Sequence, residues 1–590
     1  MKRVLLFFIF AIGLLLVRAQ SFSNLGFEYW QSAEYPLRWQ PLSMIISSDS
    51  VTKLHGKYSL KCIRMHQDVE KDKTPYGIVL QYMSSTFNYS ELKNKKVDVS
   101  VKVRVNPADT SVHAGAFIQI IDTTNPKNGN LSIGNDVTSA ISGGEWIESK
   151  TSITFKELTP DMIIYMGGIM LGHGECWMDD YQIELNGNLA KDTYPRITNL
   201  TDKEKQWLQT NLIPVSEDLQ IEKDTFIQEL GGARIVGVGD NVHGSASVVK
   251  LKNMVSRALI ESGGFTLLTI EESPGMGELI NQYIQGNSET LRWNDMNIMY
   301  NNDDFRGFAE WLREYNKYAT KKVSVLGVDI NARYEDMIEE INKSTSRKYV
   351  VQLDSIRSIY KKCIRESNTE KSGVIRGFTD GQKLYVMDNL KLIKQELVKR
   401  DPNEWRTILL TYYLDNLPSY LQFSRSVREK KMADNITWLF SHFSGEKIIY
   451  LAHNNHVSNR NFQERSTGYW LKERFKEDYY IMGTCYFDGI DLYKKSALLN
   501  GRSIIDKSLK GSYEYLFSQV DRKCFFLNLN RVPANRNPAN EWLTQPMLMR
   551  NYGVEPFNYY NEFDIINIIR EYDGVLFIKR SQPIVYGGSF

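Results

Sequence analysis

The chain has 590 residues, of which 42% are hydrophobic and 24% charged, and its formal net charge is +2. This length exceeds what one hydrophobic core usually supports, and the composition is that of an ordinary globular protein, so two or three domains are expected. The near balance of acidic and basic residues excludes the strong electrostatic attraction that drives binding to nucleic acids or anionic membranes.

Residues 1–19 are predicted to be a secretory signal peptide. Lys2 and Arg3 precede an unbroken apolar run from Val4 to Val17, and small-residue cleavage is possible after Ala19. The run is short for a transmembrane helix, which needs about 20 apolar residues. A retained membrane anchor is the alternative. We therefore expect a secreted or periplasmic protein without a stable membrane anchor.

Residues 20–190 are predicted to form an all-β sandwich. Valines at 97, 99, 101, 103 and 105 alternate with polar residues, which is the period of a half-buried strand. Short β-rich runs separated by turn residues, with no helices between them, are typical of such a sandwich. The other expected strands are Tyr58–Ile63, Ala116–Ile121, Ile163–Leu171 and Trp177–Leu185.

Five cysteines remain after the signal peptide, which is too few and too uneven for a disulfide scaffold. Cys62 and Cys176 lie in the same predicted domain and could pair. The alternative is that all five are buried apolar thiols.

Residues 191–590 are predicted to form an α/β domain with a largely parallel sheet, because helices alternate there with short apolar strands. Residues 335–445 are mostly helical and are expected to form an insertion that caps the sheet. The expected strands are Arg234–Val238, Phe265–Ile270, Lys322–Gly327, Lys447–Leu451, Tyr479–Gly483, Cys524–Leu527 and Gly574–Ile578.

Polar clusters follow four of these strands. In an open α/β sheet, ligands bind outside the carboxyl ends of parallel strands, so the four clusters should meet at one edge. The clusters are Gly239–Gly244, Glu271–Gly275, Asp329 with Asn331 and Arg333, and His453–His456.

Three of the four histidines of this domain, His243, His453 and His456, lie in these clusters. Histidine is well suited to proton transfer near neutral pH, and an adjacent carboxylate can fix its tautomer. Asp240, Glu271 and Glu272 are the available carboxylates. Each histidine taken alone could equally be structural.

No Gly-x-Ser-x-Gly nucleophile motif occurs in the chain. Ser245 and Ser247 follow His243 and are interpreted as N-cap residues of the next helix. Direct attack by a water molecule, deprotonated by a histidine base, is therefore the simplest mechanism.

A metal site is the main rival to this mechanism. His453 and His456 are three residues apart and could join His243 and Glu271 around a cation. The spacing does not match the His-Glu-x-x-His motif of zinc hydrolases. A site without a metal or other cofactor is expected.

The C-terminal motifs resemble those of the erythromycin esterase family. Gly239–Gly244 is similar to the family's Gly-Glu-x-x-His-Gly motif, and Ala452–His456 to its Ala-His-Asn-x-His motif. The segment from Arg428 to Trp438 is similar to the family's Arg-Asp-x-x-Met-Ala-x-Asn-x-x-Trp helix, and further motifs follow in order over roughly residues 200–585.

The resemblance implies hydrolysis of an ester or lactone, because the members that give the family its name open a macrolide lactone. It implies His243 as the general base, with Asp240, Glu271, His453 and His456 as the other catalytic residues. The expected substrate-binding residues are Lys252, Glu272, Asp329 and Arg428.

Three positions depart from the family pattern. The glutamate of the first motif is Asp240 here, a second family glutamate is Ser247, and the aspartate of the helical motif is Glu429. These changes put hydrolysis of macrolides in question. A catalytically degenerate protein that binds a ligand, a metal or haem is therefore the alternative function.

The N-terminal domain resembles the galactose-binding jelly rolls used as carbohydrate-binding modules. The similar segments are Asn24–Glu28, His55–Leu60 and Cys176–Asp180. The resemblance implies a glycan as a possible second partner, beside a small ester or lactone. Trp30 and Trp39 could stack on a sugar, although aromatic residues of a sandwich are more often part of its core.

Overall fold

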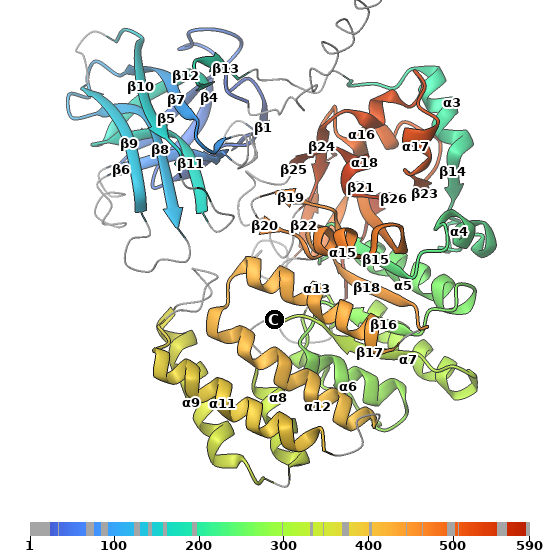
Figure 1. Cartoon of the computed structure of the whole chain (residues 1–590). Helices are drawn as coiled ribbons and strands as arrows, with labels where there is room; N and C mark the ends of the chain where they lie inside the picture. The colour runs from blue at the N-terminus through green and yellow to red at the C-terminus, as the bar shows by residue number, and fades with distance from the viewer. Residues whose placement is uncertain are drawn as a thin grey trace, which may run out of the picture.

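The structure is a computed structural model with two parts, a β-sandwich and a larger α/β domain with a helical insertion (Figure 1). It describes residues 24–585 with gaps at 33–34, 66–75, 84–91, 123–129, 140–143, 157, 159–161, 191–196, 298, 331–333, 346, 368–376, 400–403, 444, 463, 493–501, 506 and 552–562. The expected signal peptide lies outside the described residues. Within them, every helix is too short or too polar to cross a bilayer.

The N-terminal part is an antiparallel sandwich of two sheets, as predicted. The first sheet has the order β10 (Ile147–Thr154), β7 (Lys96–Val105), β12 (Gly174–Leu185), β5 (Ser59–Arg64), β4 (Ile45–Asp49), with β13 (Asn188–Leu189) paired to β12. The second has the order β3 (Gln40–Leu42), β6 (Tyr76–Tyr82), β11 (Met162–Leu171), β8 (His113–Asp122), β9 (Asn130–Ser139). A two-stranded ribbon, β1 (Trp30–Ser32) and β2 (Tyr35–Pro36), precedes them.

The core of the sandwich contains the residues that the alternating pattern indicated. All five valines of β7 are buried and belong to one apolar cluster between the sheets. Trp39 is in the same cluster, fully buried against Phe27 and Tyr181, and Trp30 packs against its border. Trp39 is therefore a core residue and not a platform for a sugar ring.

The central sheet of the second part has the order β14-β23-β26-β21-β15-β18-β16-β17, with β22 paired to β21. The strands from β26 to β17 are parallel, as predicted, while β14, β22 and β23 pair antiparallel. Their bounds are β14 (Leu212–Pro214), β15 (Ile235–Asp240), β16 (Leu267–Ile270), β17 (Ser324–Gly327), β18 (Ile448–His453), β21 (Tyr479–Leu492), β22 (Arg502–Ile505), β23 (Cys524–Asn528) and β26 (Gly574–Ser581). All seven expected strands are confirmed, whereas β14 and β22 were not anticipated.

Both faces of this sheet are covered by apolar side chains. In β18, Ile448 and Tyr450 belong to one apolar cluster and Ile449 and Leu451 to the other. A strand buried on both faces needs a continuous apolar run, which explains the sequence pattern. Helices that cover the sheet are α3 (Asp202–Asn211), α4 (Lys223–Glu229), α5 (Ala246–Glu261), α6 (Pro274–Ile284), α7 (Asp303–Tyr318) and α15 (Thr467–Phe475).

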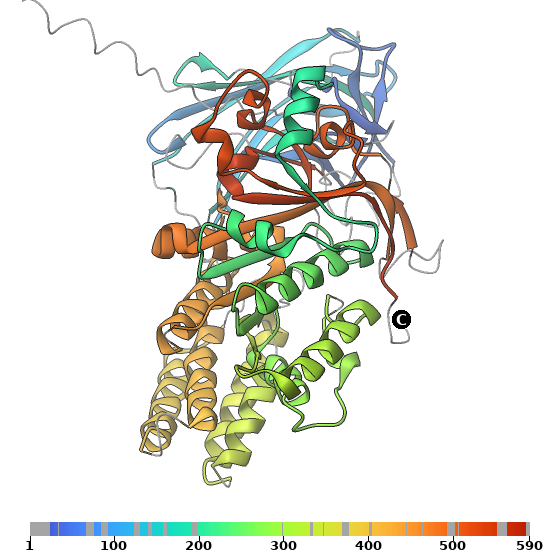
Figure 2. The ribbon, with the colours of Figure 1, turned by 90° about the vertical axis from the view of Figure 1, so that its right-hand side faces the viewer.

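The helical insertion follows β17 and extends beyond the β16–β17 edge of the sheet (Figure 2). It consists of α8 (Tyr334–Ser344), α9 (Val350–Ser367), α11 (Asp380–Leu397), α12 (Trp405–Asn416) and α13 (Arg425–His442), which matches the predicted range. Shorter elements complete the chain: α14 (Asn454–Val457), α16 (Tyr513–Phe517), α17 (Arg531–Ala534), α18 (Ile568–Glu571) and the hairpins β19–β20 (Asn461–Phe462, Glu464–Arg465) and β24–β25 (Met547–Arg550, Phe563–Ile566).

The two parts touch through a small apolar cluster. Leu37 of the sandwich is buried together with Leu548 of β24 and Phe563 of β25. The expected boundary near residue 190 falls between β13 and α3.

Candidate active site

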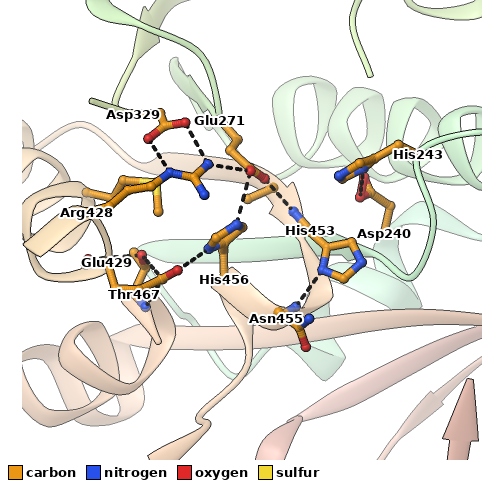
Figure 3. A network of polar contacts seen from close by, with 12 residues as sticks. Asp240, His243, Glu271, Asp329, Arg428, Glu429, His453, Asn455, His456 and Thr467 are labelled. Carbon is orange, nitrogen blue, oxygen red and sulfur yellow. Dashed lines mark hydrogen bonds and ion pairs between the residues drawn. The ribbon is translucent and has the colours of Figure 1, made fainter. Parts of the chain in front are cut away.

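The described residues of the predicted polar clusters meet at one edge of the sheet, because β15, β16, β17 and β18 run parallel. Asn331 and Arg333 lie outside the described residues. Asp240 and His453 are themselves the last residues of β15 and β18, and they stand opposite each other in the register. Both were expected just beyond their strands; pairing of these two residues lengthens the strands to include them. Figure 3 shows the resulting group of side chains.

His243 is held by an aspartate–lysine pair. Its Nδ1 lies 3.2 Å from Asp240 Oδ1, and Lys252 Nζ of α5 donates to Asp240 Oδ2 over 2.9 Å. All three side chains are buried. Burial alone would raise the pKa of Asp240, but Lys252 and His243 lower that pKa to about 2. A carboxylate at Asp240 accepts the Nδ1 proton, which leaves Nε2 as the basic nitrogen of His243.

The second ring nitrogen of His243, Nε2, has no hydrogen-bond partner within the described part of the chain. The ring lies edge-on to that of His453, with centroids 5.1 Å apart. His243 therefore has the geometry of a general base, with one nitrogen oriented and the other available.

Glu271 is the centre of a second, ionic group, drawn in the upper left of Figure 3. Its Oε1 accepts from Arg428 Nη2 at 2.9 Å and lies 3.0 Å from His456 Nε2, while its Oε2 accepts from the His453 backbone N–H at 2.9 Å. Burial favours the neutral carboxyl, but His456 and Arg428 hold the pKa of Glu271 well below its usual range. Glu271 is therefore ionised and unsuited to donate a proton.

Arg428 of α13 binds Asp329, which lies two residues after the end of β17. Its Nε and Nη2 donate to the two carboxylate oxygens of Asp329 at 2.8 and 2.7 Å, a bidentate contact. Nη1 has no partner among the described residues, and 24% of the Arg428 side chain is exposed. One donor of the guanidinium is thus left for a ligand.

His456 lies between two carboxylates. Its Nε2 faces Glu271, and its Nδ1 lies 2.6 Å from Glu429 Oε1, an ion pair whose direction is poor for a hydrogen bond. Burial would lower the pKa of His456, but Glu271 and Glu429 raise it to about 10. His456 is therefore a cation at neutral pH and cannot accept a proton there.

His453 is positioned by backbone contacts on both ring nitrogens. Nδ1 accepts from the Asn455 N–H at 3.1 Å, and Nε2 lies 3.3 Å from the Asn241 carbonyl, to which it must donate. Burial and the nearby His243 lower the pKa of His453 to about 4. This histidine is neutral and has no nitrogen free for proton transfer in this arrangement.

Glu272 and the two serines that follow His243 accept hydrogen bonds from backbone N–H groups. Glu272 accepts from the N–H groups of Ser273 and Asn297, so its carboxylate supports loops around the site. Ser245 is the N-cap of α5, as predicted. Ser247 was also expected to be an N-cap but lies inside α5, where its Oγ accepts from Gln582 N at 3.0 Å.

Sequence reasoning missed several supporting residues. Glu429 was noted only as a departure from the family motif, yet it pairs with His456 and accepts from Thr467 N at 2.8 Å. Tyr300 connects two strand ends, since its hydroxyl donates to the Leu451 carbonyl and accepts from the Glu271 N–H. Glu429 could have been found as the neighbour of Arg428, whereas no sequence signal marked Tyr300.

The rival metal set is His243, His453, His456 and Glu271. The nitrogens of His453 are bonded to backbone groups, and those of His456 face carboxylates. In the described residues, no group of three or more His, Cys, Asp or Glu side chains is arranged to hold a metal ion.

Parts of the chain are similar to known proteins. The family model for erythromycin esterase matches residues 260–581, which include Glu271, Arg428, His453 and His456. Erythromycin esterase type II of Escherichia coli is 25% identical over 326 residues, 48% of this chain and 77% of that protein.

Two solved structures are similar to parts of the chain. A protein from Bacillus cereus has the same fold over 66% of this chain and 99% of its own length, with 18% identity and a TM-score of 0.55. The N-terminal part resembles the xylan-binding domain of a Paenibacillus barcinonensis protein, with 13% identity and a TM-score of 0.21, covering 30% of this chain and 99% of that domain. Since the family model spans more than half of the sequence, the chain belongs to the erythromycin esterase family.

Proposed function

We propose that this protein hydrolyses a carboxylic ester or lactone with a water molecule activated by His243. The observation that carries the proposal is the Asp240–His243 contact, which orients the imidazole and leaves Nε2 without a partner among the described residues. A base positioned in this way contributes about 10²–10⁴ to the rate of a hydrolytic reaction.

Nε2 of His243 takes a proton from water while the water oxygen bonds to the carbonyl carbon, forming a tetrahedral oxyanion. The C–O bond to the alcohol then breaks, and the imidazolium returns its proton to the departing alkoxide. An ester yields one acid and one alcohol, a lactone yields a single hydroxy acid, and no covalent enzyme intermediate forms.

The oxyanion needs a nearby donor or positive charge. The unpartnered Nη1 of Arg428 supports assigning that role to Arg428, which is kept in place by Asp329 and Glu271. Glu271 and His456 carry opposite fixed charges and act as positioning residues. Lys252 keeps Asp240 ionised.

The test begins with a screen of the purified full chain against simple esters, lactones and acylated sugars. On any substrate found, His243→Ala is expected to lower kcat by at least about 100-fold. His442→Ala is the matched control, because His442 lies at the far end of α13, stacked on Trp438, and is expected to leave kcat unchanged.

If the His243→Ala variant hydrolyses the substrate at the wild-type rate, His243 has no part in the mechanism. A folded wild-type protein without activity on the whole panel would favour the alternative of a binding protein that has lost catalysis.

We also propose that the chain is exported, on the evidence of the basic start and apolar run of residues 1–19. Cell fractionation followed by N-terminal sequencing tests this. A mature protein that begins close to Gln20 is expected, whereas an intact N-terminus in the membrane fraction would favour a retained anchor.

A further inference from the structure

Two cysteines face each other in the sandwich. Cys62 of β5 and Cys176 of β12 are directly opposite in the antiparallel register. Both side chains are fully buried and belong to the same apolar cluster, so both point between the sheets. Opposite residues of antiparallel strands have Cα atoms about 4.5–5.5 Å apart, within the roughly 4.4–6.8 Å that a disulfide spans.

The other three cysteines have no such partner. Cys485 on β21 and Cys524 on β23 are separated by β26, so about 9–10 Å divides them. They also contribute to apolar clusters on opposite faces of the sheet. Cys363 lies in α9 of the insertion. Register therefore selects one pair out of five cysteines.

In the structure both residues are buried free thiols. The contact with Cys176 and the burial of the side chain raise the pKa of the Cys62 thiol well above its usual range. Because thiol–disulfide exchange requires a thiolate that an oxidant can reach, a bond between them must form before β5 and β12 close, or during a transient opening.

We propose that Cys62 and Cys176 form a structural disulfide when the chain folds in the presence of a disulfide oxidant. One thiolate attacks the oxidant's disulfide and forms a mixed disulfide, and the second thiolate then displaces the oxidant's remaining sulfur. Each cysteine loses one proton, and two electrons pass to the oxidant, which leaves as two thiols. The bond joins neighbouring strands and closes a loop that contains β6 to β11.

Such a bond restricts the unfolded chain more than the folded one. The sandwich should therefore unfold at a higher temperature when oxidised, by about 5–10 °C. The proposal does not depend on the hydrolytic activity.

The full chain is refolded in a buffer of reduced and oxidised glutathione and then alkylated with iodoacetamide in denaturant, because all five cysteines are buried in the folded chain. The product is mapped by mass spectrometry without reduction. We expect peptides containing Cys62 and Cys176 to be linked, with a mass two hydrogens below their sum, and the other three cysteines to be alkylated. Reduction before the melt should remove the added thermal stability.

Cys62→Ala and Cys363→Ala provide a matched pair of variants. Cys62→Ala should leave Cys176 alkylated and make the melting temperature independent of redox conditions, whereas Cys363→Ala should keep the link. Alkylation of both Cys62 and Cys176 in refolded wild-type protein, or a link between any other pair, would overturn the proposal. The wild-type map decides the matter even if a variant fails to fold.

Discussion

Asp240 is the residue at which this chain differs most consequentially from its family pattern, which has glutamate there. Its two oxygens are fully engaged, one with His243 and the other with Lys252, and all three side chains are buried. Because both partners contact the aspartate directly, we interpret the site as remodelled around Asp240 and not as decayed.

The Asp240→Glu variant tests that interpretation. The added methylene moves the carboxylate by roughly 1.5 Å if the backbone is unchanged, and a displacement of about 1 Å can cost 100-fold in rate. We expect no gain on the native substrate and an increase in any trace hydrolysis of a macrolide. Steady-state rates of both proteins on both substrates measure this; a large gain on every ester would show a weakened esterase instead.

His456 gives a second prediction, for stability against pH. Its pKa is about 10 in the folded protein, against about 6.5 in an unfolded chain. The folded state therefore binds more protons between these values, so the stabilisation from His456 is complete below pH 6.5 and is lost as the pH rises to 10.

Chemical denaturation of wild type and His456→Gln across this range measures the effect. The variant is expected to be less stable at pH 6.5 by about 3–5 kcal/mol, because it leaves buried carboxylates without their cation. The difference between the two proteins should shrink toward pH 10. A constant difference would show that His456 is not protonated in the folded state.

At the scale of elements, α13 connects the helical insertion to the site. Its first turns carry Arg428 and Glu429, which contact the ends of β17 and β16 and the helix α14. The insertion thus adds the charged side chains of Arg428 and Glu429 to those at the strand ends. Movement of α13 would change the position of the Arg428 donor.

Arg428→Lys preserves the charge but cannot reproduce the bidentate contact with Asp329. If Nη1 of Arg428 stabilises the oxyanion, kcat should fall by about 10²–10³-fold with a smaller change in KM. A change confined to KM would assign Arg428 to substrate binding. Arg474→Lys is the control. Arg474 of α15 forms an ion pair with Asp434 of α13, away from the site, and its replacement should leave both constants unchanged.

At the scale of the whole molecule, the sandwich is linked to the site through the β24–β25 hairpin. Asp564 of β25 accepts from Arg460 Nη1 at 3.0 Å, and the same Nη1 donates to Asn455 Oδ1 at 2.8 Å. The Asn455 N–H in turn orients His453. Burial alone would raise the pKa of Asp564, but Arg460 and then Arg38 of the sandwich lower that pKa below its usual value. Asp564 therefore interacts both with the sandwich and with Arg460, which contacts Asn455 of the site.

Leu37→Asp is expected to loosen this contact, because it places a charge between Leu548 and Phe563. The sandwich and the α/β domain should then unfold in separate transitions by calorimetry, with a lower first melting temperature. Leu42→Asp, at a sandwich position that is 56% exposed, is the control. An unchanged single transition in Leu37→Asp would show that this cluster does not couple the domains.

The fragment 190–590 bears on the same contact. We expect it to fold, because its sheet and both apolar clusters are internal to it, but to expose Leu548 and Phe563.

The two-part architecture, the seven main strands, the helical insertion and the meeting of polar clusters at one sheet edge could all be predicted from the sequence. These features follow from local hydrophobic period and from the rule that parallel strands end on the same side. The pairing of Asp240 with His243 was also within reach, since the two residues are three positions apart.

The sequence could not show which of the three histidines has a nitrogen available to act as a base. His453 is a neutral residue bonded to backbone and His456 is a buried cation, because partners distant in sequence surround each one, whereas His243 keeps one nitrogen without a partner among the described residues. Glu429 and Glu271 together make His456 a cation, and the Asn241 carbonyl fixes His453. The protonation of a side chain depends on burial and on charges brought near it by folding, and no local pattern in the sequence encodes these.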